Sequence, residues 1–358
     1  MKYLIYPFYD ECSSLIELLR YKEENVEFEY VVYPRAWIKK VNIPVGISGS
    51  CDYEECLDFV KGVIITDISK YPYLYQDIVK KIHIALDNGC TVKCCAKLEE
   101  ENRREFENLS ERFFYYQEDT EKIQDVKKNG NPYQIQDCVV VGVGNLLQGM
   151  DSLEEVSHLY KKLSEEGYKV SVITSNRNGT IMGYNLFPEE ILQDAYDIQV
   201  LELNRYFNKV QEEDHADILL VQIDGGMLKY SNICYGDFGV KSYIVSQALA
   251  IDYFILVSPV VDMMQENYQE LSAIFKHRFG YHIDVVLFEN LYIDLEESDS
   301  EEKIIYRKID EIEMQKIMER NYIPGSSDII YGSNSDTKEY DLIIENCIEK
   351  LSNDYRQI

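Results

Sequence analysis

Short apolar runs alternate with segments of helical periodicity along the first hundred residues. The runs that resemble strands are "KYLIYPF", "EFEYVVYP", "KGVIITDI" and "TVKCCAKL", and they are largely apolar, as buried parallel strands tend to be. Between them, "SSLIELLRY" predicts a short helix. "LYQDIVKKIHIALDNG" predicts an amphipathic helix with Ile78, Ile82 and Leu86 on one stripe and Gly89 as its stop. This alternation predicts a Rossmann-like α/β domain over residues 1–98.

A second series of strands and helices follows a charged segment. Residues 99–137 are rich in charge and helical in their first half, and we interpret them as a charged helical linker. Strands are then expected at "CVVVGVG", "YKVSVITS", "ADILLVQIDGG", "YFILVSP" and "HIDVVLFE", with amphipathic segments between them. The pattern predicts a second α/β domain with a parallel sheet over residues 138–358, ending in an acidic C-terminal extension from about Leu295.

The segment "VVVGVGNLLQGMDSLEEV" has the frame of a phosphate loop, with an apolar strand, a glycine turn and the start of a helix. A phosphate loop reads G-x-x-x-x-G-K-[ST], because backbone N–H groups, a helix N-terminus and a lysine converge on the anion. Gly144 and Gly149 keep that spacing. Met150 stands where the lysine is needed, Asp151 where the hydroxyl is needed, and Ser152 follows one residue late. The frame is present, but its cation is missing.

Nothing nearby in the sequence replaces that lysine. A variant of the loop carries its lysine just after the first glycine, where this chain has Asn145. The helix start is acidic, since Asp151, Glu154 and Glu155 already satisfy its positive end, and Ser152 and Glu155 have the spacing of a capping box. Phosphates placed there would crowd like charges unless Mg²⁺ or a partner's lysine intervened. We interpret the loop as degenerate and non-hydrolysing; nucleotide binding by another route and a plain strand–helix turn are the alternatives.

Two further strand ends carry polar candidates. Asp224 ends an apolar strand and precedes Gly225 and Gly226, which is where P-loop enzymes hold Mg²⁺; a turn aspartate before two glycines is the competing interpretation. The loop "TSNRNGTIMGYNLFP" offers Asn176 and Arg177. Ligands of open α/β sheets bind at the carboxyl ends of strands. These two loops and the glycine loop are therefore expected to meet in one crevice.

Charge and length narrow the choice of partners. The chain has 358 residues with a formal net charge of −28, which disfavours nucleic acid and anionic membranes. Such a charge favours a cationic partner such as a basic peptide, or simply keeps the protein in solution, which is the preferred interpretation. No apolar run reaches the roughly 20 residues needed to cross a bilayer. The start, "MKYLIYPFYDECSS", predicts a strand rather than a signal peptide. We expect a cytoplasmic protein.

Nine cysteines are scattered over the chain, without the paired C-x-x-C spacing of zinc or iron–sulfur sites. Cys94 and Cys95 are adjacent in a predicted strand, so their side chains face opposite ways and are poorly placed to share one ion. Buried free thiols in a reducing compartment are the expected state. A redox or metal protein that uses Cys90, Cys94 and Cys95 is the alternative.

Several segments resemble a family of bacterial peptide maturation system proteins, which accompany ribosomally made, modified peptides. The resemblance lies in "GYKVSVITSNRNGTIMGYNLFP", "LELNRYFNKV", "DILLVQIDGGMLKYSN", "FGVKSYIVSQAL" and the N-terminal "YPFYDECSSLIELLRY". The second domain also resembles P-loop proteins of the dethiobiotin synthetase and nitrogenase-iron-protein class. That resemblance implies a phosphate site at Gly144 and Gly149, a metal site at Asp224, ATP or GTP with Mg²⁺ as cofactors, and a homodimer.

Two functions follow as hypotheses. The first is an accessory protein of peptide maturation that uses a degenerate P-loop fold to bind a precursor peptide or a partner modifying enzyme. The alternative is an ATP- or GTP-dependent enzyme, a ligase or NTPase, that acts on the peptide or on a small carboxylate. This alternative needs a lysine from elsewhere, such as Lys241 or a residue of a dimer partner.

Overall fold

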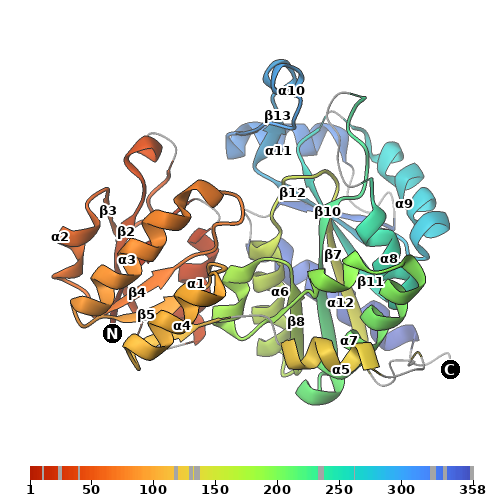
Figure 1. Ribbon diagram of the computed structural model, residues 1–358. Coiled ribbons are helices and arrows are strands. Elements are labelled where there is room, and N and C mark those ends of the chain that lie inside the picture. Colours follow the sequence, from red (N-terminus) through yellow and green to blue (C-terminus); the bar gives the residue numbers. More distant parts are fainter. Residues whose placement is uncertain are drawn as a thin grey trace. The chain divides into compact units, whose positions relative to one another are not determined.

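The chain folds into two compact α/β units, each with its own sheet (Figure 1). The first unit comprises Met1–Asp119 and Asn176–Leu186, and the second comprises Thr120–Ser175 and Phe187–Ile358. The α/β fold class expected from the sequence is confirmed. A computed structural model describes residues 1–9, 12–22, 26–38, 41–116, 120–128, 132, 138–232, 238–261, 263–322, 328–333 and 337–354.

Six parallel strands form the first sheet, in the order β3-β2-β1-β4-β5-β6. This is the strand order of dinucleotide-binding Rossmann sheets, so the Rossmann-like prediction for the first unit is confirmed. The pattern of apolar runs missed β3 and β6, each of which has only three residues. The strands are β1 (Lys2–Tyr6), β2 (Glu27–Val32), β3 (Ser48–Ser50), β4 (Gly62–Ile65), β5 (Thr91–Cys94) and β6 (Phe113–Tyr115).

Helices of the first unit bury one apolar face each. In α3, Ile78 and Ile82 are fully buried and Leu86 is nearly so, as the helical stripe predicts. Removing such side chains from water contributes about 1.5–3 kcal/mol each. The helices are α1 (Ser13–Lys22), α2 (Tyr53–Leu57), α3 (Tyr75–Asp87) and α4 (Glu100–Leu109), with short 3₁₀ turns η2 (Arg35–Trp37) and η3 (Pro72–Leu74).

The segment expected to be a charged linker contains α4, β6 and α5 (Thr120–Lys128). β6 pairs in parallel with β5, with Phe113 opposite Val92. Phe106 and Phe113 are buried and pack against each other with ring centroids 5.2 Å apart. Since these aromatic residues complete the first core, the first unit extends past residue 98. Residues 117–119, 129–131 and 133–137 of the expected linker lie outside the described part of the chain.

The second sheet has seven strands in the order β15-β12-β11-β7-β10-β8-β9. β7 lies between β11 and β10, and the pairs from β15 to β8 are parallel. The predicted parallel sheet of the second domain is therefore present. The strands are β7 (Val139–Asn145), β8 (Val170–Thr174), β9 (Asn185–Leu186), β10 (Ile218–Gly226), β11 (Tyr253–Pro259), β12 (Val285–Glu289) and β15 (Ile330–Ser333).

Helices and a small hairpin complete the second unit. β13 (Leu291–Ile293) and β14 (Tyr306–Lys308) pair antiparallel, within the segment expected to be an acidic extension. The helices are α5, α6 (Leu153–Glu165), α7 (Tyr196–Asp214), α8 (Val240–Ala248), α9 (Gln265–Phe279), α10 (Leu295–Glu301), α11 (Glu311–Asn321) and α12 (Thr337–Asp354), with the 3₁₀ turn η5 (Glu189–Gln193). A further 3₁₀ turn, η4 (Arg177–Met182), belongs to the first unit. None of the described helices is long and apolar enough to cross a membrane.

Candidate functional site

A β-bulge at the end of β10 positions Asp224. In the ladder between β10 and β7, Ile223 pairs with Gly144 and Gly226 pairs with Asn145, so Asp224 and Gly225 are left out of the pairing. A bulge of this kind re-aims the side chain that it excludes. The Asp224 side chain is exposed, and its Oδ1 accepts a hydrogen bond from the Gly225 N–H at 2.7 Å. β7 and β10 are neighbours, so the glycine loop and Asp224 lie at the same end of the sheet.

The backbone of the glycine loop is engaged within the protein. The Leu146 N–H donates to the Val257 carbonyl oxygen at 2.8 Å, which continues the sheet beyond β7. The side-chain amide of Asn145 donates to the Met150 carbonyl oxygen at 3.2 Å. Met150, at the lysine position, is only 5% exposed. A phosphate site needs loop N–H groups that point at the ligand. In this loop, however, the Leu146 N–H is hydrogen-bonded to β11 and the Met150 side chain is buried in the protein.

Neighbouring residues cover the same loop. A side chain at position 226 would place its Cβ 2.5 Å from the backbone nitrogen of Gln148, so only glycine fits there. The Tyr306 hydroxyl donates to the Gln148 carbonyl oxygen at 2.7 Å. Gly149 has φ +91°, a conformation that strongly favours glycine. The predicted residues Gly149 and Gly226 therefore have structural roles: a left-handed turn and a close approach of two backbones.

Ser152 belongs to a buried chain of hydrogen bonds. Its hydroxyl oxygen accepts from the Gln222 side-chain amide at 3.2 Å, and the Gln222 amide oxygen accepts from the Thr174 hydroxyl. Ser152 is fully buried, so its hydroxyl faces the core and not a ligand. The expected capping box with Glu155 is wrong: Ser152 makes no side-chain cap, and Asp151 accepts from the Leu153 N–H at 3.1 Å instead. Asp151 thus satisfies one of the orphan N–H groups at the helix start, while the Ser152 hydroxyl is engaged with Gln222.

The loop with Asn176 and Arg177 joins the first unit. The Arg177 Nε donates to the Cys95 carbonyl oxygen at 3.0 Å, and its Nη2 donates to the Tyr116 carbonyl oxygen at 3.2 Å. The Asn176 side chain caps η4 by accepting from the Asn178 N–H at 2.9 Å. Both Arg177 partners follow strands of the first sheet, and neither Asn176 nor Arg177 is among the lining residues of the pocket described below.

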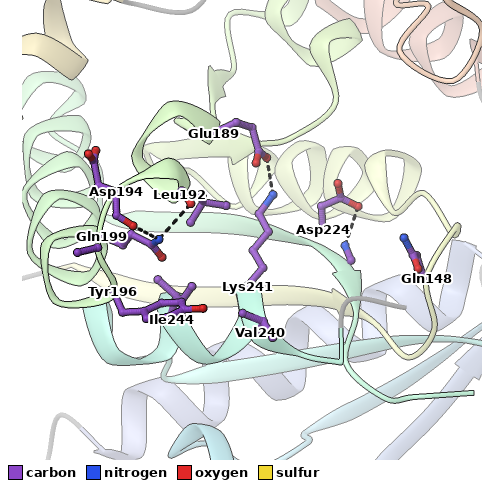
Figure 2. Close-up of a pocket in the computed structure, with 12 residues that line it drawn as sticks. Gln148, Glu189, Leu192, Asp194, Tyr196, Gln199, Asp224, Val240, Lys241 and Ile244 are labelled. Atoms are coloured by element: carbon purple, nitrogen blue, oxygen red, sulfur yellow. Dashed lines mark hydrogen bonds and ion pairs between the residues drawn. The ribbon is translucent and has the colours of Figure 1, made fainter. Parts of the chain in front are cut away.

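A pocket of about 720 Å³ opens at the carboxyl end of the second sheet (Figure 2). Gln148 of the glycine loop and the bulge residues Asp224 and Gly225 form one part of its lining. The start of α8 contributes a second part, with Val240, Lys241 and Ile244. The segment from η5 into α7 contributes the third part, with Glu189, Leu192, Asp194, Ala195, Tyr196 and Gln199. The predicted residues Asp224, Gly225 and Lys241 are thus brought together, whereas Gly144, Gly149, Ser152 and Gly226 do not line the pocket.

Lys241 is paired inside the pocket. Its Nζ lies 2.5 Å from Glu189 Oε1 and donates to the Ser175 hydroxyl oxygen at 2.9 Å. It also lies 4.1 Å from the centroid of the Phe187 ring, a cation–π arrangement. The Lys241 side chain is only 10% exposed. Figure 2 shows Lys241 extending to Glu189, with Asp224 on one side of it in this view. The lysine charge is thereby neutralised by a pocket carboxylate.

Gln199 contributes a buried acceptor to the lining. Its Nε2 donates to the carbonyl oxygens of Leu192 at 3.0 Å and Asp194 at 2.6 Å. Its Oε1 has no hydrogen-bond partner in the described part of the chain. Gln199, Glu189, Asp194 and Tyr196 were missed at the sequence level. They lie on the 3₁₀ turn η5, directly after it, and in the first turn of α7, where no spacing pattern signals a site.

No metal centre is evident in the part of the chain that the structure describes. There, no group of three or more His, Cys, Asp or Glu side chains is arranged to hold an ion, so the proposed Mg²⁺ ligand Asp224 has no companions from this set. Cys90, Cys94 and Cys95 are buried free thiols. Burial raises the pKa of Cys95 to about 12 and also raises the pKa values of Cys90 and Cys94. Since the thiolate is the reactive form, these cysteines are held unreactive, which argues against the redox alternative.

One solved structure has the same fold as this chain. The chain shares its fold with a DUF1611 family protein. That crystal structure, from Anabaena variabilis, matches 97% of this chain and 99% of its own at 10% identity, with a TM-score of 0.57. A GTPase from Pyrococcus abyssi in its apo form matches 61% of this chain and 99% of its own at 16% identity, but a TM-score of 0.32 carries no argument. No protein-family model and no curated protein matches the sequence.

Proposed function

We propose that this protein is an accessory protein that binds a peptide in the maturation of a ribosomally synthesised peptide. In this proposal the phosphate-loop frame is a scaffold and does not hydrolyse nucleotide. The observation that carries the proposal is the pocket of the second unit, whose lining has three carboxylates, Glu189, Asp194 and Asp224, and one lysine already paired with Glu189. Such a lining suits a cationic guest better than a polyphosphate.

Electrostatics supports a peptide over a nucleotide. A triphosphate needs cations and free N–H groups, and here Met150 replaces the loop lysine while the Leu146 N–H bonds to β11. The net charge of −28 adds a long-range field that repels anions and attracts basic segments. The resemblance to peptide maturation proteins supplies the partner class, a precursor peptide or its modifying enzyme.

The second candidate is an ATP- or GTP-dependent enzyme that acts on a peptide or small carboxylate. One observation favours it, since Lys241, Asp224 and Gln148 line the same pocket beside the glycine loop. Lys241 would have to exchange Glu189 for a phosphate oxygen. That exchange is opposed by the 2.5 Å ion pair and by the buried position of the ammonium group.

Binding measurements separate the two candidates. Isothermal calorimetry with MgATP and MgGTP is compared with fluorescence anisotropy of two labelled glycine–serine peptides, one carrying arginines and the other glutamates. We expect the basic peptide to bind, the acidic peptide to fail, and both nucleotides to show no micromolar affinity. Micromolar nucleotide binding with turnover that Lys241→Met abolishes would establish the enzyme instead. Lys276→Met, which removes the same charge from an exposed position on α9, is the control.

A further inference from the structure

We infer that the pocket at Asp224 receives the cationic side chain of an arginine or lysine of the partner peptide. This inference rests on the proposed function and names the chemistry that its pocket recognises. Three features carry it: a carboxylate held at the rim, a buried acceptor in the wall, and apolar surface between them.

Asp224 supplies the charge. The bulge excludes it from the ladder and leaves its side chain exposed at the pocket. In the described part of the chain no lysine, arginine or histidine lies within ion-pair distance of its carboxylate, and its one hydrogen bond comes from the Gly225 N–H. The other two pocket carboxylates are engaged, Glu189 with Lys241 and Asp194 with Lys127 at 3.3 Å. Asp224 is therefore the carboxylate left for a guest.

Gln199 supplies the acceptor. Both of its amide hydrogens are committed to backbone carbonyl oxygens, which fixes the orientation of the side chain. Its Oε1 is consequently held as an acceptor, and a buried acceptor without a donor is unfavourable. Guanidinium and ammonium groups carry only donors, so either one satisfies this oxygen. A phosphate or carboxylate guest would instead place its own acceptor oxygens against the Gln199 Oε1, where no hydrogen bond can form.

The remaining wall fits the stem of such a side chain. Leu192 and Ile244 are apolar lining residues, and Tyr196 is 72% exposed beside them. Lysine and arginine bury their methylene stems on such surface while the charged head reaches a polar partner, and the face of a tyrosine ring attracts a cation. Lys241 does not oppose the guest, because Glu189 and Ser175 hold its ammonium group.

The test uses small probes on the full-length protein. N-acetyl-arginine amide and N-acetyl-lysine amide are compared with N-acetyl-citrulline amide, which has the shape of arginine without its charge, as competitors of the labelled basic peptide. We expect both cationic probes to compete and the citrulline probe to be about ten-fold weaker or worse, because a charge-assisted hydrogen bond is lost. Competition should weaken as salt rises, since the Asp224 carboxylate is exposed.

Variants assign the effect to the pocket. Asp224→Asn should weaken the arginine probe about ten-fold and Asp224→Lys should abolish its competition, because the exposed side chain can be changed without disturbing the core. Glu270→Gln, a matched loss of charge at an exposed position of α9, should have no effect. A basic peptide that binds equally well to Asp224→Lys would overturn this inference and leave peptide binding intact. Displacement of the peptide by inorganic phosphate or MgATP would overturn the inference and the proposed function together.

Discussion

Arg177 donates from its Nε to the carbonyl oxygen of Cys95 at 3.0 Å, although the two residues are 82 positions apart. Its Nη2 donates to the Tyr116 carbonyl oxygen, just past β6. Asn178 makes a parallel pair of contacts, from its Nδ2 to the Tyr9 hydroxyl at 2.8 Å and from the Asp67 N–H to its Oδ1 at 2.6 Å. These partners follow β5, β6, β1 and β4. The chain's own residues thus occupy the carboxyl edge where Rossmann sheets hold ligands.

Arg177→Ala should destabilise the first unit, because it leaves two carbonyl oxygens without their charged donor. We expect a loss of about 2–4 kcal/mol in the free energy of unfolding, measured by denaturant titration of the transition that reports the first unit. Arg104→Ala is the control, since the Arg104 side chain is 70% exposed and pairs only with Glu100 in the described contacts. An equal effect of both substitutions would remove any special role for Arg177.

Gly226→Ala should disturb the junction of β10 with the glycine loop. The added Cβ meets the backbone nitrogen of Gln148 at 2.5 Å, and backbone cannot swing away as a side-chain end can. We expect a loss of about 1–3 kcal/mol in stability, from thermal or denaturant unfolding. Gly167→Ala, where the Cβ meets open space but φ is +95°, gives the reference cost of backbone strain alone. A neutral Gly226→Ala would show that the loop has room to shift.

Met150→Lys restores the sequence signature of a phosphate loop but should not restore its function. Met150 is 5% exposed, so the new ammonium group must be buried or must push the loop open. We expect a loss of stability of about 1–3 kcal/mol and no micromolar binding of MgATP or MgGTP by calorimetry. Met150→Leu, which keeps volume and polarity, should cost less than about 1.5 kcal/mol. A gain of nucleotide affinity in Met150→Lys would mean that the loop lacks only its cation.

Glu202→Gln should stabilise the second unit in a pH-dependent way. Burial, together with the nearby Asp194, raises the pKa of Glu202 on helix α7. Its charged form is therefore penalised in the fold. The penalty is absent where the group is protonated in both folded and unfolded states, and it is complete above the raised pKa. The stability difference between Glu202→Gln and the unchanged protein should accordingly grow as pH rises from about 4 to 8. Glu212→Gln, exposed on the same helix, should show no such trend.

The local pattern of apolar and polar residues was sufficient to predict most of the helices and longer strands. Ile78 and Ile82 are four residues apart and both fully buried in α3, as a 3.6-residue period requires. The longer strands could be predicted because buried parallel strands are continuous apolar runs. β6 could not, since Phe113 lies between charged segments in a strand of three residues, and only its pairing with β5 defines it.

The residues of the candidate site likewise fall into those that the sequence could indicate and those that it could not. Asp224 and Gly225 could be selected from the chain, because a strand end followed by glycines is a local signal and ligands bind at such ends. Lys241 could be named only as a possible substitute for the missing loop lysine, without a local signal of its own. Glu189 and Gln199 could not be, since a 3₁₀ turn and the first turn of a helix carry no pattern that marks a pocket wall. Arg177 shows the limit most clearly. Arg177 follows β8, a strand of the second sheet, by three residues. Its hydrogen bonds nevertheless go to carbonyl oxygens 61 and 82 residues away, which follow strands of the first sheet. The periodicity of apolar residues along a chain indicates which face of a helix or strand is buried. It does not indicate which distant carbonyl oxygens will accept hydrogen bonds from one guanidinium group, because those partners come together only when the elements pack.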